Sequence, residues 1–141
     1  MLLKNNKPWY HGSPRKLTKL QAGSTVTQRL DIARIFSHKP AVVVGDGSES
    51  GWRHTGPFAK GFVYLLAEQV NENDVEAVPN SCMLPGHEWN TRREFELQLL
   101  AETTVNPDEL LTKHELREMV KCGKVSKAIV EMIFQKQKLP E

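Results

Sequence analysis

The pattern of apolar residues changes near Asn106 and Pro107, and this change constrains the fold more than any other feature of the chain. Before it, short apolar runs are interrupted by Gly, Pro, Asn and Ser, which is typical of strands and turns. After it, apolar residues recur at helical spacing, and Gly123 provides a stop. We therefore expect an α+β chain, with strands and one early helix in residues 1–105 and a helical hairpin in residues 106–141 that packs on the same domain.

Five segments carry strand patterns, and one of them leads into a helix. The helix follows the second strand, because Leu30, Ala33 and Phe36 fall on one face of a helix that Thr27 or Asp31 can cap. The β-branched run in the third segment and the apolar run in the fourth are typical of buried strands. The expected strands cover residues 8–13, 23–27, 41–44, 61–67 and 94–100.

The last of these strands alternates polar and apolar side chains. Phe95, Leu97 and Leu99 are expected to face a core, while Glu94 and Glu96 share the opposite face. Two neighbouring carboxylates repel each other unless a cation, a hydrogen-bond donor or a substrate hydroxyl lies between them. This strand is therefore the first indication of chemistry.

Composition excludes several classes of protein. The 141 residues are 39% hydrophobic and 26% charged, with a net charge of +2, which is typical of one globular domain. Two cysteines, Cys82 and Cys122, do not make a disulfide framework. The N-terminus lacks the apolar core of a signal peptide and no apolar run is long enough to span a bilayer, so we expect a cytoplasmic protein without a membrane partner. Balanced charge argues against a protein that works mainly by neutralising nucleic-acid phosphates.

Common catalytic signatures are absent from the sequence. It contains no phosphate-binding P-loop, no strand-linked G-x-G-x-x-G, no G-x-S-x-G and no H-E-x-x-H. Cys82, His87, His114 and Cys122 do not have the spacing of a structural zinc site, so no metal is expected. A set of short motifs distributed along the chain remains.

Four of these motifs, in this order, resemble the ADP-ribosyltransferase superfamily. The segment Tyr10-His11-Gly12-Ser13 is similar to the His-Gly-Ser/Thr motif of the poly(ADP-ribose) polymerase and rifampicin-modifying branches. Residues 25–33 resemble the second-motif strand and its helix, although Thr25 stands where a stacking Tyr is usual in the polymerase-like branch. The resemblance extends over about residues 8–102.

The two later motifs concern the acidic residues. Residues 61–64 followed by 71–74 are similar to the strand and acidic loop of the rifampicin-modifying enzymes. The segment Glu94-Phe95-Glu96 is similar both to the catalytic Glu that opens the last polymerase-type strand and to the Glu-x-Glu of the toxin-like branch. The resemblance implies a split antiparallel sheet with a cleft. It also implies that the chain transfers ADP-ribose from NAD to an acceptor and releases nicotinamide.

The resemblance also assigns roles to particular residues. His11 would bond a ribose hydroxyl, and the Gly12 backbone would bind the nicotinamide amide. Cleavage of the bond between nicotinamide and ribose passes through an oxocarbenium-like state, which negative charge stabilises. The implied catalytic residues are Glu94, Glu96, His11 and Asp74, the last because the rifampicin-modifying branch has its acidic residue in that loop. The implied NAD-binding residues are His11, Gly12, Ser13, Arg15, Thr25, Thr27 and Tyr64.

Several assignments stay open. Tyr64 or Trp52 can replace the missing stacking Tyr, and Trp89 is either an acceptor contact or a rim anchor. Cations suit the pyrophosphate, and the candidates are Arg15, Lys16, Arg53 and His54. The acceptor is a small molecule, a protein or a nucleic acid. One alternative is an inactive binding module whose basic tail helices contact a partner, and another is an RNA 2′-phosphotransferase, which also starts from a His-Gly motif.

Overall fold

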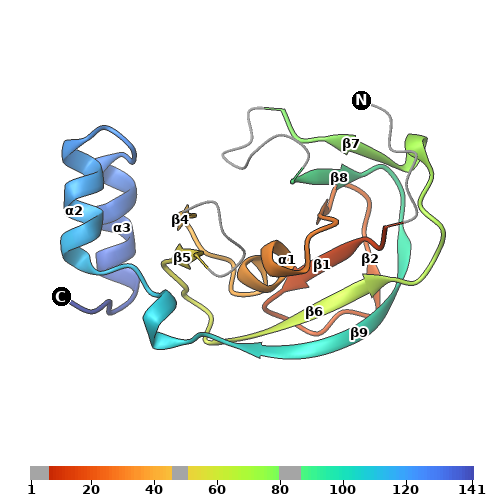
Figure 1. Cartoon of the computed structure of the whole chain (residues 1–141), viewed down its shortest axis with the longest axis horizontal. Coiled ribbons are helices and arrows are strands. Elements are labelled where there is room, and N and C mark those ends of the chain that lie inside the picture. Colours follow the sequence, from red (N-terminus) through yellow and green to blue (C-terminus); the bar gives the residue numbers. More distant parts are fainter. Residues whose placement is uncertain (1–6, 46–50, 80–86) are drawn as a thin grey trace.

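The computed structural model describes residues 7–45, 51–79 and 87–141, and it confirms a mixed α+β chain (Figure 1). The strands are β1 (Tyr10–Ser13), β2 (Lys19–Leu20), β3 (Thr25–Val26), β4 (Val43–Val44), β5 (Arg53–His54), β6 (Lys60–Leu66), β7 (Val75–Ala77), β8 (Trp89–Thr91) and β9 (Phe95–Thr104). The helices are α1 (Leu30–Phe36), α2 (Lys113–Lys121) and α3 (Lys127–Lys136), with short 3₁₀ turns η1 (Glu72–Asp74) and η2 (Pro107–Glu109).

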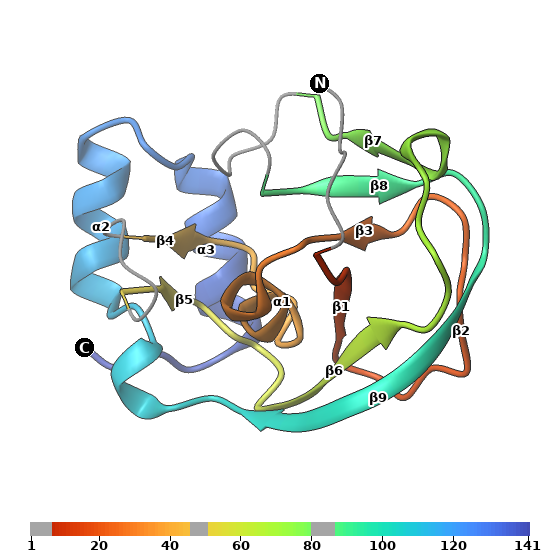
Figure 2. The same cartoon turned by 45° about the vertical axis from the view of Figure 1, so that its right-hand side comes forward.

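Two antiparallel sheets form one curled layer. The first has the order β1-β6-β9-β2 and the second β3-β8-β7, while β4 and β5 form a separate pair. A bridge between Tyr10 and Thr27 joins β1 to β3, with backbone hydrogen bonds of 2.7 and 3.0 Å. The strands therefore follow one another around a curve, so that β8 lies across from β6 and β9 (Figures 1 and 2).

A hydrophobic core fills the inside of this curve. Trp9, Val26 and Trp89 belong to it, together with Leu66 and Phe95 from the first sheet. The Trp9 and Trp89 rings pack edge to face, with centroids 5.8 Å apart. The expectation that Trp89 is an acceptor contact or a rim anchor was wrong, because its side chain is only 4% exposed inside this core.

Two glycines let α1 pack closely on the first sheet. A Cβ on Gly12 would overlap the carbonyl oxygen of Ala33 and lie 2.6 Å from the Ser37 nitrogen, and a Cβ on Gly61 would lie 2.7 Å from the Ser37 side chain.

The prediction of which residues form the buried face of α1 was wrong in part. Its buried residues include Ile32, Ala33 and Ile35, whereas Leu30 is 52% exposed.

Other sequence expectations need similar correction. The run 41–44 is not a buried strand, because only Val42 is buried and β4 is a two-residue strand with its second residue exposed. In β9, Phe95 is buried but Leu99 is 48% exposed, since the curled layer leaves the middle of this strand without a covering element. Strands β2, β5, β7 and β8 were not predicted, because runs of two or three residues give at most a weak periodic signal.

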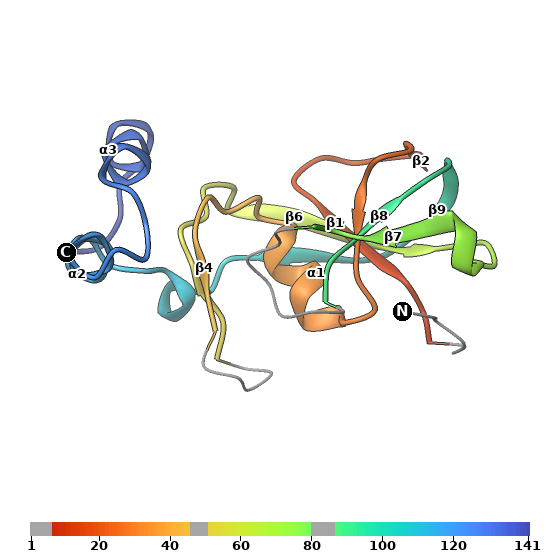
Figure 3. The same ribbon diagram turned by 90° about the horizontal axis from the view of Figure 1, so that it is seen from above.

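The tail forms the expected helical hairpin. Helix α2 begins at Lys113, and the side chain of its N-cap residue, Thr112, forms a capping box with Glu115. Ser126 caps α3 by accepting a hydrogen bond from the Ile129 nitrogen. A second core joins the hairpin to the β4–β5 region through Val42, Leu111, Leu116, Val130, Ile133 and Leu139. Seen from above, the hairpin lies to one side of the curled layer (Figure 3). Within the described ranges, no helix has the length and apolar character needed to cross a membrane.

Candidate functional site

A cleft of about 640 Å³ opens beside β1, and its volume is in the range of small-molecule sites. One wall consists of β1 and the turn after it, including His11, Gly12 and Ser13. Thr25 from β3 and Glu88, the residue before β8, also line the cleft. We refer to this feature, lined by these residues and the cations described below, as the β1 cleft.

His11 is held in the wall by a short hydrogen bond. Its Nδ1 lies 2.6 Å from the carbonyl oxygen of Thr25, so Nδ1 carries the hydrogen and donates it. Burial lowers the pKa of His11 below its ordinary 6.5, and the Thr25 carbonyl opposes that shift. The imidazole is therefore neutral at pH 7, and its Nε2 is a hydrogen-bond acceptor.

The polar residues near His11 divide into cleft residues and structural residues. Ser13 is buried in the wall, and its Oγ accepts a hydrogen bond of 3.1 Å from the Arg15 nitrogen. Thr25 is half-buried and lines the cleft. Thr27 does not line it: this residue is 1% exposed, and its Oγ1 accepts a hydrogen bond from the Arg29 nitrogen.

Tyr64 does not line the cleft. It pairs with His11 in the β1–β6 register, but its side chain is only 3% exposed. Its hydroxyl accepts a hydrogen bond of 2.7 Å from the nitrogen of Leu17, and Leu17 does line the cleft. Tyr64 therefore shapes the cleft through Leu17. The other stacking candidate, Trp52, donates its Nε1 hydrogen to Asp31 and is not among the lining residues either.

The three carboxylates expected to be catalytic lie outside the β1 cleft. Glu94 and Glu96 are exposed, and Glu96 pairs with Lys19 at 3.6 Å. Asp74 lies 3.2 Å from Arg93. Burial acts to raise the pKa of Asp74, but its hydrogen bonds with the Asn71 nitrogen and with Arg93 outweigh burial and lower it. Asp74 is thus an ionised partner of a structural arginine.

Glu88 is the carboxylate that reasoning from sequence missed. Strand β3 pairs with β8 so that Val26 faces Trp89, and both side chains point to the core. Side chains alternate along a strand, so Glu88 lies on the face opposite Trp89, and it lines the cleft with Thr25. The alternation of Glu88, Trp89 and Asn90 was the available signal, but the segment was read as a loop.

Cations line the same cleft. Arg15 follows β1, Lys19 lies in β2, and Lys39 follows α1. Lys39 has a φ of 47°, in the left-handed region that non-glycine residues rarely adopt, and its nitrogen donates to the Phe36 carbonyl at 2.9 Å. Lys19 pairs with Glu96, which leaves Arg15 and Lys39 against the carboxylate of Glu88. This balance favours an anionic ligand, phosphate groups above all.

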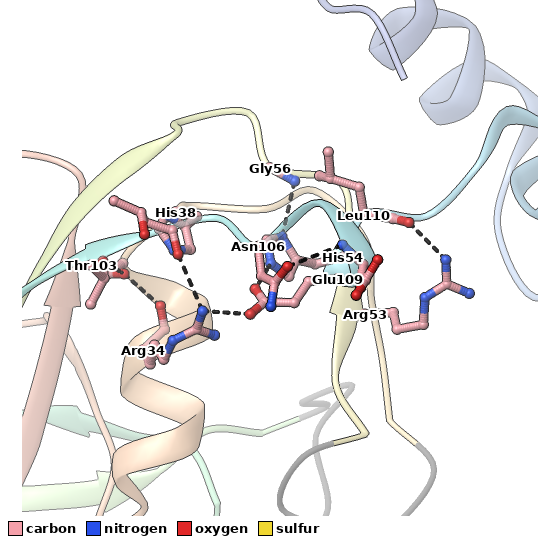
Figure 4. Close-up of polar contacts among 12 residues, drawn as sticks. Arg34, His38, Arg53, His54, Gly56, Thr103, Asn106, Glu109 and Leu110 are labelled. Carbon is pink, nitrogen blue, oxygen red and sulfur yellow. Dashed lines mark hydrogen bonds and ion pairs between the residues drawn. The ribbon is translucent and has the colours of Figure 1, made fainter. Parts of the chain in front are cut away.

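A second polar cluster lies away from the cleft and joins the early helix to the tail (Figure 4). Arg34 forms an ion pair with Glu109, and the other oxygen of Glu109 lies 3.1 Å from Nε2 of His54. The Gly56 nitrogen donates to Nδ1 of His54 at 3.0 Å, so the hydrogen of this imidazole is on Nε2.

Arg53 and His54 were also candidates for binding the pyrophosphate. His54 is fully buried, and Arg53 donates to the Leu110 carbonyl at 2.7 Å. Neither residue lines the cleft, so their expected role as pyrophosphate ligands is not supported.

This cluster makes stability depend on pH. His38 is also buried and stacks on His54, with ring centroids 5.6 Å apart. Burial is the largest cause that lowers the pKa of both imidazoles from 6.5, against opposing contacts with the Phe58 carbonyl and with Glu109. The unfolded chain binds protons near pH 6.5 that the folded chain does not bind, so stability is full above that pH.

We therefore expect the free energy of unfolding to fall as the pH drops below 6.5 toward the lowered pKa values of His38 and His54. Urea unfolding at a series of pH values measures this dependence. His54→Gln should weaken it, whereas His114→Gln, at an exposed position, should leave it unchanged. An unfolding free energy that is constant from pH 7.5 to pH 5 would contradict the prediction.

The remaining expectations concern cysteine and metal sites. Cys82 lies outside the described residues. In the described part of the chain, no group of three His, Cys, Asp or Glu side chains is arranged to hold a metal ion. No protein-family model, no curated protein and no solved structure gives a significant match to the chain.

Proposed function

We propose that the chain is an NAD-dependent ADP-ribosyltransferase with the split sheet of that superfamily. The observation that carries the proposal is the convergence of His11, Ser13, Thr25 and Glu88 on one cleft of ligand size. These residues come from β1, β3 and the start of β8, which are neighbours in the curled layer. The cleft thus joins a hydrogen-bond acceptor, a carboxylate and cations, which are the groups that NAD and its cleavage require.

In this proposal, His11 and the cations bind NAD. The free Nε2 of His11 accepts a hydrogen bond from a ribose hydroxyl, because Nδ1 is already committed to Thr25. Arg15 and Lys39 face the two negative charges of the diphosphate. The Gly12 backbone lines the cleft and binds the nicotinamide amide, whereas the space left by its missing side chain is filled by α1.

Glu88 then supplies the negative charge for bond cleavage. The bond between the ribose carbon and the nicotinamide nitrogen breaks, and its electron pair leaves with nicotinamide. The carboxylate stabilises the oxocarbenium-like ribose, and the acceptor atom bonds to the same carbon and releases its proton to solvent. The acceptor is a small molecule, a protein or a nucleic acid.

The test of this function is release of nicotinamide from NAD by the purified chain, with NAD binding measured by calorimetry. We expect release by the wild type, and at least tenfold weaker NAD binding by His11→Ala, because a buried hydrogen bond to ribose is lost. Absence of both NAD binding and release would exclude the enzyme. The chain would then be the alternative binding module, and pull-down with the tail helices would be the next experiment.

The cleft cations Arg15 and Lys39 also favour the second enzyme candidate, an RNA 2′-phosphotransferase, because its substrate presents an RNA phosphate to the cleft. Incubation with a 2′-phosphorylated RNA oligonucleotide and NAD separates the two activities. Loss of the 2′-phosphate would favour the phosphotransferase, whereas nicotinamide release without RNA favours the ADP-ribosyltransferase.

We expect Arg15→Gln and Lys39→Gln each to weaken NAD binding by about tenfold, because a charge-assisted hydrogen bond to a phosphate contributes about 1.5 kcal/mol. Each variant should also reduce the salt dependence of binding. Lys16→Gln is the matched control, since Lys16 is an exposed cation beside Arg15 that does not line the cleft. Equal losses in all three variants would mean that only the net charge matters.

A further inference from the structure

We propose that Arg29 is a positioning residue that holds Glu88 in place through His87. This inference rests on the proposed function, because it concerns the carboxylate assigned there. Arg29 lies between β3 and α1, where its nitrogen bonds the Thr27 hydroxyl and its carbonyl accepts from the Ala33 nitrogen at 3.1 Å. Its backbone is thus fixed at both ends, and its side chain extends toward the start of β8.

The guanidinium of Arg29 contacts two residues at once. Nε and Nη2 donate to the two carboxylate oxygens of Asp31 at 3.0 and 2.7 Å, which is a bidentate pair. Nη1 lies 3.3 Å from Nε2 of His87, the residue next to Glu88. Trp52 donates to Asp31 at 2.7 Å and so fixes the carboxylate that orients the guanidinium.

The contact also defines the state of His87. An arginine can only donate, so Nε2 of His87 accepts and the ring hydrogen lies on Nδ1. Burial lowers the pKa of His87, and the positive charge of Arg29 lowers it further, against the effect of Asp31. The imidazole is neutral at pH 7, and Arg29 is the partner of its Nε2.

Residues 25–29 therefore contact both of these parts of the β1 cleft. The Thr25 carbonyl fixes His11, and the Arg29 side chain fixes His87, the residue next to Glu88. Strand β3 pairs with β8 only over Thr25 and Val26, so the register ends one residue before Glu88. On its other side, the Glu88 carbonyl accepts a hydrogen bond of 3.2 Å from the Val78 nitrogen. Arg29 adds a connection from the β3 side through the neighbouring His87. Misplacement of a catalytic group by about 1 Å can cost about 100-fold in rate.

The test is the kinetics of Arg29→Gln. We expect kcat for nicotinamide release to fall by about 10- to 100-fold, while the Kd for NAD changes less than threefold, because Arg29 does not line the cleft. Asp31→Asn should lower kcat in the same direction by less, since its amide oxygen still accepts from Trp52. Arg92→Gln is the matched control, because Arg92 follows the other end of β8 and forms an exposed pair with Glu76 at 3.1 Å.

The outcomes separate this inference from the proposed function. If the wild type releases no nicotinamide, the proposed function fails and the positioning role fails with it. If the wild type is active but Arg29→Gln keeps its kcat, or loses NAD affinity and kcat in parallel, only the positioning role is overturned. Thermal unfolding and ¹⁵N spectra of the imidazoles check each variant. The inference also requires that the His87 signals change in Arg29→Gln while the His11 signals do not.

Discussion

Glu88→Gln is expected to lower the rate of nicotinamide release by about 10²- to 10³-fold, while the Kd for NAD stays within about threefold of the wild type. The amide has nearly the shape of the carboxylate, so binding contacts are retained. It lacks the negative charge that stabilises the oxocarbenium-like ribose, so only the transition state is affected. Single-turnover release of nicotinamide, with calorimetry on the same samples, measures both quantities.

Variants of the other carboxylates test whether the effect is specific to Glu88. Glu76→Gln is the control, because Glu76 is an exposed residue of the same sheet, opposite Asn90 in the register. Its rate should equal that of the wild type. If Glu94→Gln, Glu96→Gln or Asp74→Asn abolished release while Glu88→Gln remained active, the assignment of Glu88 would be wrong. The original assignment from the motif resemblance would then hold.

The elements that depend on residues close together in the sequence were predicted best. The β1 motif, the strand β6 and the tail helices each carry a local signal of periodicity or capping, and each is present in the structure. The burial of Leu99 and the apolar face of α1 were predicted less well, because they depend on what packs against them. Local patterns give the period of an element, but tertiary contacts decide which face is covered.

The residues of the candidate site differ in the same way. Those in short local motifs were predicted, whereas the residue placed by long-range strand pairing was not. His11, Ser13 and Thr25 were identified from short motifs, and all three line the cleft. Glu88 was not identified, because its place beside them follows from the pairing of β3 with β8, about sixty residues apart in the chain. Tyr64 was assigned to NAD binding although it is buried behind Leu17. Residues opposite each other in an antiparallel pair share a face of the sheet, but the pairing does not reveal that the Leu17 segment covers Tyr64.

Gly12→Ala has the largest expected effect on stability. We expect it to lower the free energy of unfolding by about 3 kcal/mol or more, because the new Cβ would overlap the Ala33 carbonyl and crowd the Ser37 nitrogen. Both are backbone atoms of α1 and its cap, so the helix must move away from the sheet. Urea unfolding measures the loss.

Gly23→Ala is the matched control for this effect. Gly23 has a φ of 85° and open space around its Cβ position, so alanine there meets only the left-handed backbone penalty of about 1–2 kcal/mol. Gly12 lines the cleft as well as contacting α1, which makes the comparison informative. If Gly12→Ala unfolded like the wild type but lost NAD binding, the glycine would serve the ligand alone. A loss larger than that of Gly23→Ala means that packing against α1 already requires glycine at this position, whatever the cleft binds.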